Sequence, residues 1–171
     1  MNTGTVETVK EEDINEEVAS ISQLLREGKA FVIRNVTFVD FKRLLEERFS
    51  TGAFAIFYDV GRECGIRSCQ RLMQRHPGRV GLLEAVARYK RDELWGEFRF
   101  ELDKDGTGEV YVANCFEARQ YGPSKQPVCY FVKGYLEGLL SQAFSRPLRA
   151  TETACIAKGD RECVFQIEQK S

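Results

Sequence analysis

The residue types best suited to chemistry lie near the C-terminus, where two strand-like runs flank a turn at residues 158–160. If these runs pair symmetrically about Gly159, Cys155 lies directly opposite Cys163. Directly opposed residues share one face of a hairpin, with Cβ atoms about 5 Å apart, and two thiolates so placed can bind one metal ion. Because Cys163 alternates with Phe165 along its strand, we expect both thiols to face the core.

Two further side chains extend this pair into a set of metal ligands. Cys129 falls in the first turn of a predicted helix, where the helix N-terminus favours the thiolate form. Glu152 precedes Cys155 by three residues, so it needs a β-bulge to join the thiols on their face of the strand. The alternative is that these cysteines are inert, small apolar residues of the core. With the bulge, three sulfurs and one carboxylate suit tetrahedral Zn²⁺: Cys129, Glu152, Cys155 and Cys163.

Hydrophobic periodicity predicts the elements that must position these side chains. Period-two alternation predicts two hairpins, and hairpins require antiparallel pairing. The predicted class is therefore α+β, an antiparallel β-sheet packed by helices. Gly52 and Gly65 are expected to end helices, and Gly134 and Gly138 lie four residues apart, which permits close backbone approach. The predicted helices cover 21–26, 38–49, 53–64, 67–74, 80–95 and 128–140, and the predicted strands cover 30–34, 98–102, 110–116, 148–157 and 163–168.

The amino-acid composition limits which class of protein this can be and which roles its histidine and cysteines can have. The chain has 171 residues, 43% hydrophobic and 30% charged, with a formal net charge of −1, which is typical of a globular protein and argues against a nucleic-acid binder. No apolar run approaches the ~18 residues that span a membrane, and no secretory signal is visible, so we expect a cytoplasmic protein with reduced thiols. A single histidine, His76, excludes multi-histidine metal sites. Cys64, Cys69 and Cys115 have no spacing comparable to the ligand set and are expected to be core residues.

The N-terminal segment differs from the rest of the chain in charge. Its first seventeen residues contain six acids and one base, so residues 1–20 are expected to be a solvated acidic tail, and residues 21–171 a single domain. A partner-docking arm is the alternative for this tail. Farther along, Arg67, Arg71 and Arg75 recur every four residues, which is typical of a solvated helix face. An acidic partner, or the tail itself, is the alternative for this basic row.

Residues 152–165 (ETACIAKGDRECVF) resemble the closing signature of the 4-vinyl reductase domain family. Three more stretches are similar to that family: 57–65 (FYDVGRECG), 109–117 and 127–140 (PVCYFVKGYLEGLL), so the resemblance covers about residues 30–168. It implies the α+β ligand-binding fold of NO-signalling and Golgi-transport proteins, which haem-NO-binding sensors share with transport-particle (TRAPP) subunits. In the aromatic-responsive transcription activators that carry this domain, one zinc ion is held by Cys, Glu, Cys and Cys.

The resemblance implies the same zinc site in the present chain. Glu152, Cys155 and Cys163 meet the Glu-x-x-Cys-x7-Cys spacing of the family, and Cys129 matches its upstream cysteine. The resemblance therefore implies one Zn²⁺ per chain. Its role would be structural, because four protein ligands leave no open position for catalysis.

The resemblance also implies a site for a small molecule. In the related sensors, a pocket between the sheet and the helices holds a small aromatic ligand beside the zinc, so we expect a small apolar or aromatic molecule here. Most aromatic residues are expected to belong to an ordinary core, and some of the matching region are candidates for the wall of the pocket. These candidates are Tyr58, Trp95, Phe98, Phe116 and Tyr135.

Three functions fit these expectations. The first is a sensor-type ligand-binding domain that acts through a partner or a homodimer, with the Gly134/Gly138 helix face as one candidate for the dimer contact. The second is an accessory protein for vinyl reduction in tetrapyrrole metabolism. No nicotinamide or flavin motif is visible, so we assign no catalytic residue and place binding before catalysis. The third is a protein-assembly scaffold like the transport-particle subunits.

Overall fold

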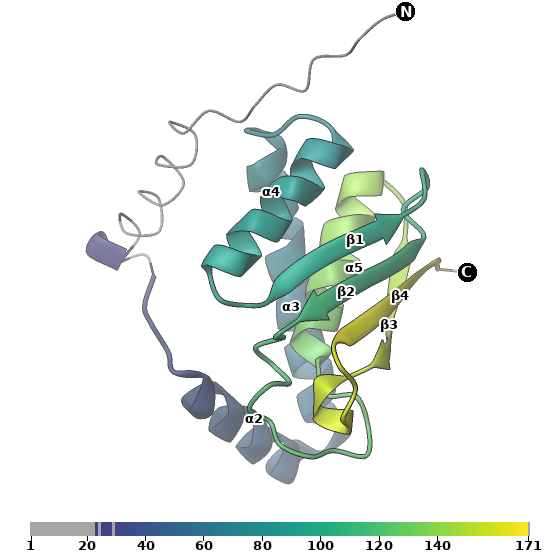
Figure 1. The fold of residues 1–171 in the computed structure, drawn as a ribbon. Coiled ribbons are helices and arrows are strands. Elements are labelled where there is room, and N and C mark those ends of the chain that lie inside the picture. Colours follow the sequence, from purple (N-terminus) through teal and green to yellow (C-terminus); the bar gives the residue numbers. More distant parts are fainter. Residues whose placement is uncertain (1–22, 24, 29, 171) are drawn as a thin grey trace, which may run out of the picture. The chain divides into compact units, whose positions relative to one another are not determined.

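The computed structural model describes residues 23, 25–28 and 30–170, and the chain divides into two compact units, residues 1–34 and 35–171. The acidic tail predicted over residues 1–20 lies outside the described residues. The second unit contains the β-sheet and the longer helices, and it carries every predicted site residue (Figure 1).

The first unit contains a short helical turn. Gln23, Leu25 and Arg26 are helical, and the turn ends at Gly28, whose φ of +67° suits glycine. The predicted stop at Gly28 is confirmed, whereas residues 21, 22 and 24 of the predicted helix lie outside the described residues. The predicted strand over residues 30–34 is wrong, because these residues have no regular secondary structure. A strand needs a hydrogen-bonded neighbour, and the four-stranded sheet contains no strand from this segment.

Three consecutive helices open the second unit: α2 (Asn35–Phe49), α3 (Thr51–Met73) and α4 (Arg79–Asp92). The break between α2 and α3 lies at Ser50, whose φ is +47°, and not at Gly52 as predicted. The predicted helix end at Gly65 is also wrong, because α3 continues through it. A glycine costs about 1 kcal/mol inside a helix, and packing against another helix outweighs that cost here. No helix in the described part of the chain is long and apolar enough to cross a membrane.

One antiparallel sheet, in the order β1-β2-β4-β3, contains β1 (Glu97–Leu102), β2 (Gly108–Ala113), β3 (Leu148–Ala154) and β4 (Cys163–Gln169). β1 pairs with β2 and β3 pairs with β4, as the two predicted hairpins require. Helix α5 (Tyr130–Phe144) lies between these hairpins in the sequence. The α+β prediction is therefore confirmed.

The sheet has one buried face and one exposed face. Alternate side chains of β2 and β4, including Val112, Phe165 and Ile167, are buried, whereas Arg99 and Glu101 point to the opposite side and are exposed. Figure 1 shows α3 and α5 together behind the sheet. This asymmetry fixes the strand register, because a slip by one residue would turn the apolar side chains toward solvent.

Helices α3 and α5 cross with their backbones in close contact. A Cβ atom added at Gly65 would lie 2.1 Å from the carbonyl oxygen of Tyr135, and one added at Gly138 would lie 2.1 Å from that of Arg62. Gly134 meets the backbone of α3 in the same way. The Gly134/Gly138 face is therefore covered within the chain, and its prediction as a dimer contact is wrong.

A buried carboxylate joins α5 to both neighbouring layers. Glu137 of α5 accepts hydrogen bonds from the Tyr58 hydroxyl of α3 and from the Ala150 N–H of β3. Lys170 adds an ion pair to Glu137 at 2.8 Å. Burial opposes ionisation of Glu137, but the hydrogen bonds from these three donors outweigh burial and lower its pKa. The charged form of Glu137 therefore stabilises the contact between helices and sheet.

Candidate metal centre

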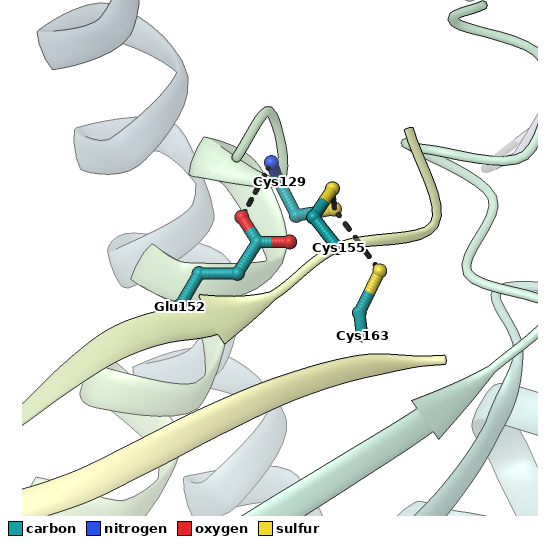
Figure 2. Close-up of side chains that lie close together, drawn as sticks. All are labelled: Cys129, Glu152, Cys155 and Cys163. Atoms are coloured by element: carbon teal, nitrogen blue, oxygen red, sulfur yellow. Dashed lines mark hydrogen bonds between the residues drawn. The ribbon is translucent and has the colours of Figure 1, made fainter. Parts of the chain in front are cut away.

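The last hairpin contains the irregularity that the ligand set requires. Ala154 pairs with Val164, whereas Glu152 pairs with Phe165, so one extra residue is inserted into β3. Glu152 follows Ala150 on the buried face of β3 and lies opposite Phe165, and the extra residue after it allows Cys155 to lie on the same side as Glu152 and Cys163. The predicted bulge is confirmed, and Figure 2 shows Glu152 directed toward the cysteines.

Four side chains from separate elements converge beside this bulge. Cys129 immediately precedes α5, Cys155 follows β3 and Cys163 begins β4. The Cys129 sulfur lies 3.6 Å from that of Cys163 and 3.9 Å from that of Cys155. Together with a Glu152 oxygen, the ligand atoms all lie within 4.8 Å of one another. A zinc–sulfur bond of about 2.3 Å gives a tetrahedral edge of about 3.8 Å, so these separations suit a single metal ion.

The carboxylate of Glu152 has one oxygen without a partner. Its Oε2 accepts the backbone N–H of Cys129 at 2.9 Å, whereas its buried Oε1 has no hydrogen-bond partner among the described residues. Burial raises the pKa of Glu152 to about 9, because a charge at this position is poorly solvated. A divalent cation would reverse that penalty and bind the free oxygen, so the donor set fits zinc.

Local hydrogen bonds organise the segment between β3 and β4, which begins with a 3₁₀ turn, η1 (Ile156–Lys158). The Cys155 N–H donates to Asp160 Oδ2 at 2.8 Å, and the Ile156 N–H donates to the Cys163 sulfur at 3.5 Å. An N–H group directed at sulfur favours the thiolate, which is the form that binds metal. The segment is therefore folded around the sulfur atoms.

A buried ion pair holds the start of α5, next to Cys129. Glu117 accepts the backbone N–H groups of Phe131 and Val132 at 3.1 and 2.9 Å and so caps the helix. Lys42 of α2 pairs with this carboxylate, and both side chains are fully buried. Burial raises the pKa of Glu117, while Lys42 opposes that shift. The position of Cys129 thus depends on a contact with α2.

Sequence reasoning missed this ion pair. Lys42 lies on the same stripe of α2 as Phe38 and Leu45, at spacings of four and three residues. A lysine within an apolar stripe was the available signal. Its ammonium group lies 5.1 Å from the centre of the Phe57 ring, which explains how the surrounding aromatic residues tolerate it.

Cys115 is buried as predicted, but it is not separate from the thiol cluster. Its sulfur lies 3.7 Å from that of Cys129, so the prediction that it lacks a comparable geometry is wrong. Asn114 has a φ of +54°, and the Cys115 carbonyl accepts the N–H of Arg119, which turns the chain back after β2. Cys69, in contrast, is an ordinary core thiol of α3, and burial raises its pKa to about 11.

Three of the five predicted wall residues meet in one place. The Trp95 ring lies 5.2 Å from the Phe116 ring and 5.3 Å from the Tyr135 ring. Phe131 lies 5.3 Å from Trp95 and completes what we call the tryptophan cluster, Trp95, Phe116, Phe131 and Tyr135. The buried Lys90 places its ammonium group 3.6 Å from the centre of the Trp95 ring.

The tryptophan cluster also contains an unpaired polar atom. The buried hydroxyl of Tyr135 lies near Ser68 but makes no hydrogen bond of normal geometry with the described residues. The other two predicted wall residues have different contacts. Phe98 packs on the Phe100 ring of the same strand, and Tyr58 donates to Glu137.

Two open hollows lie near the metal ligands. One, of ≈ 250 Å³, is lined by Phe54, Tyr121 and Tyr130 among others, and one, of ≈ 270 Å³, includes Arg119 and Lys158. Neither hollow is lined by any of the five predicted wall residues. The rings of the tryptophan cluster pack on one another, with centroids 5.2–5.3 Å from that of Trp95.

The β3–β4 hairpin and α5 lie in a region of the sequence that matches a known domain family. Residues 109–169 match the 4-vinyl reductase domain family, and this span contains the four candidate ligands. The uncharacterized protein MJ0150 of Methanocaldococcus jannaschii is 25% identical over 117 residues. That alignment covers 68% of this chain and 65% of the relative, so the chain spans less than two thirds of that protein.

Solved structures show the same fold at low sequence identity. The phenol-responsive sensory domain of the transcription activator PoxR, solved with phenol, has a TM-score of 0.68 at 19% identity and covers 82% of this chain and 76% of its own. A vinyl-4-reductase family protein from Methanocaldococcus jannaschii has a TM-score of 0.62 at 19% identity, with 98% of this chain and 100% of its own covered.

Proposed function

Residues 109–169 belong to the 4-vinyl reductase domain family, and from that premise we propose that the protein is a sensor-type domain that binds a small aromatic or apolar molecule and contains one structural zinc ion. The observation that most directly supports this proposal is the convergence of three thiols and one carboxylate at the start of α5. The next turns of the same helix contribute Phe131 and Tyr135 to the tryptophan cluster. Metal site and aromatic cluster are therefore built on one helix.

The proposed zinc ligands are Cys129, Glu152, Cys155 and Cys163. The free Glu152 Oε1 supports this assignment, because a buried carboxylate oxygen without a partner is costly unless a cation binds it. With four protein ligands, the ion would join the start of α5 to the β3–β4 hairpin and leave no open position. The free energy of metal binding would then contribute to folding.

The proposed site for the organic ligand is the tryptophan cluster. It offers aromatic surface together with two polar groups, the Lys90 ammonium, which pairs with Glu93, and the unpaired Tyr135 hydroxyl. This combination suits a planar molecule with one hydroxyl or carboxylate group. The fold shared with the PoxR sensory domain, which was solved with phenol, supports the same class of ligand. The rings must separate to admit it, because they contact one another.

We propose that the output of ligand binding passes through a second copy of the chain or a partner. Exposed apolar side chains of α2 and α3 support this proposal, because they offer surface that an interface could bury. Phe41, Phe49, Ile56 and Val60 are each about half exposed, at 47–59%. Light scattering on the purified protein should give a dimer mass, and Val60→Glu should lower it toward that of a monomer.

Metal analysis combined with ligand titration tests both halves of the proposed function. The purified protein should contain about one zinc per chain. Phenol, titrated in a thermal-melt assay, should raise the melting temperature of the wild type but not of Trp95→Ala, which should retain its zinc. Absence of metal with six titratable thiols would refute the zinc site. A phenol response equal in both proteins would refute the tryptophan cluster as the ligand site.

A further inference from the structure

Cys115 is not one of the four proposed ligands, yet its sulfur contacts that of Cys129. The Cys129 sulfur has three sulfur neighbours, those of Cys115 at 3.7 Å, Cys155 at 3.9 Å and Cys163 at 3.6 Å. All three distances match the edge of about 3.8 Å expected for a zinc–sulfur tetrahedron. Cys115 therefore lies at the separation from Cys129 that two sulfur ligands of one metal ion would have.

The Cys115 thiol lies beside the thiol cluster inside the core. Its sulfur is 3.7 Å from the Cys129 sulfur, and the residue is fully buried. The turn at Asn114 and the hydrogen bond from the Arg119 N–H to the Cys115 carbonyl hold the chain in this place. Cys115 thus shares its surroundings with a proposed ligand.

Glu152 has a function that does not require metal. Its Oε2 accepts the N–H of Cys129 at the start of α5, where the backbone N–H groups lack partners within the helix. A carboxylate that leaves the metal therefore keeps this hydrogen bond. The fourth position of the site has two candidate donors as a result, one oxygen and one sulfur.

We propose that Cys115 is an alternative fourth ligand, which replaces the Glu152 carboxylate and converts a Cys₃Glu site into a Cys₄ site. The inference rests on the proposed zinc site. In the exchange a metal–sulfur bond to Cys115 forms as its thiol proton passes to solvent, and the metal–oxygen bond to Glu152 breaks, leaving its carboxylate hydrogen-bonded to the Cys129 N–H. Because sulfur ligands select softer metal ions than carboxylates do, the fifth donor lets one site accept metal ions of different softness.

Cobalt(II) is the probe for this exchange, because the intensity of its thiolate charge-transfer band increases with the number of bound thiolates. The wild type should show a three-thiolate band. Glu152→Gln should still bind one Co²⁺ per chain, with a band about one third stronger. Adding Cys115→Ser to that variant should weaken Co²⁺ binding by more than the about 100-fold that loss of an outer-shell contact costs. Cys115→Ser alone should leave the wild-type band unchanged, as should the control Cys69→Ser.

The outcomes separate this inference from the zinc site itself. Equal loss of cobalt from Glu152→Gln and from the double variant would overturn the exchange while leaving the wild-type site intact. A weaker band in Cys115→Ser alone would make Cys115 a resident ligand and would also overturn the exchange. A wild-type chain that binds neither Co²⁺ nor Zn²⁺ would instead refute the proposed zinc site. Circular dichroism of each variant, with and without Co²⁺, shows that the comparison is made on folded protein.

Discussion

Replacing Gly65 with alanine should force α3 and α5 apart. The new Cβ atom would lie 2.1 Å from the carbonyl oxygen of Tyr135 and 2.8 Å from the backbone nitrogen of Leu139. Both are backbone atoms within a helix, so neither can rotate away. Non-bonded heavy atoms are separated by about 3.5 Å at their optimum, so the helices would have to move by roughly 1 Å.

This movement would lower the free energy of unfolding, because it disturbs packing at the centre of the core. Tyr135, Leu136 and Leu139 of α5 are fully buried, so separation of the helices loosens contacts on every side of them. Overpacking costs about 1–3 kcal/mol, and a clash with rigid backbone belongs at the upper end of that range. Alanine gains up to about 1 kcal/mol in helix propensity, so the net loss should be about 2 kcal/mol. For a chain of this size, that loss lowers Tm by about 4–8 °C.

Urea unfolding at a fixed zinc concentration measures this effect, with the free energy of unfolding taken from the midpoint and slope. Gly81→Ala is the matched control, because Gly81 lies on α4 with nothing within 4 Å of an added Cβ. The control should be neutral or more stable than the wild type, by up to about 1 kcal/mol. A Gly65→Ala protein within about 0.5 kcal/mol of the wild type would refute the close crossing of α3 and α5.

Three further predictions concern the metal site and the buried charges. Cys155→Ser should lose zinc in metal analysis and melt at a lower temperature, whereas Cys69→Ser should keep its zinc; equal metal content in both would contradict the ligand assignment. Lys42→Met should lower the free energy of unfolding by about 3–5 kcal/mol in urea, because it leaves Glu117 buried without a cation, and adding Glu117→Gln should recover part of that loss. Because the folded-state pKa of Glu137 lies below 4.5, its stabilisation is complete above pH 4.5 and is lost as the pH falls through the folded value. Glu137→Gln should therefore flatten the acid side of a plot of Tm against pH, and an unchanged slope would show that Glu137 is not responsible.

The parts of the fold that depend on local pattern could be predicted from the sequence. Alternation of apolar residues located both hairpins, since a strand with one buried face must alternate. The need to bring Glu152 and Cys155 to one face was enough to predict the bulge in β3, because a strand offers few other ways to change the face of one side chain.

Features that depend on distant contacts could not be predicted in this way. Gly65 has the local signature of a helix end, and only the approach of α5 explains why α3 continues through it. The pairing of Lys42 with Glu117 joins residues 75 positions apart. Cys115 reaches the thiol cluster through a turn at Asn114, a left-handed residue that no pattern of hydrophobicity marks.

Helix α5 begins after Cys129 and carries Tyr135 six residues later, about 9 Å along its axis. Because glycine contacts hold α5 against α3, one end of α5 cannot shift alone. Binding of an ion at its start and binding of a molecule beside Tyr135 would therefore be coupled, and the coupling would be equal in both directions. If zinc strengthens the binding of a phenol about tenfold, the phenol must strengthen the binding of zinc by the same factor. The concentration of available zinc would then set the concentration of organic molecule at which the domain responds.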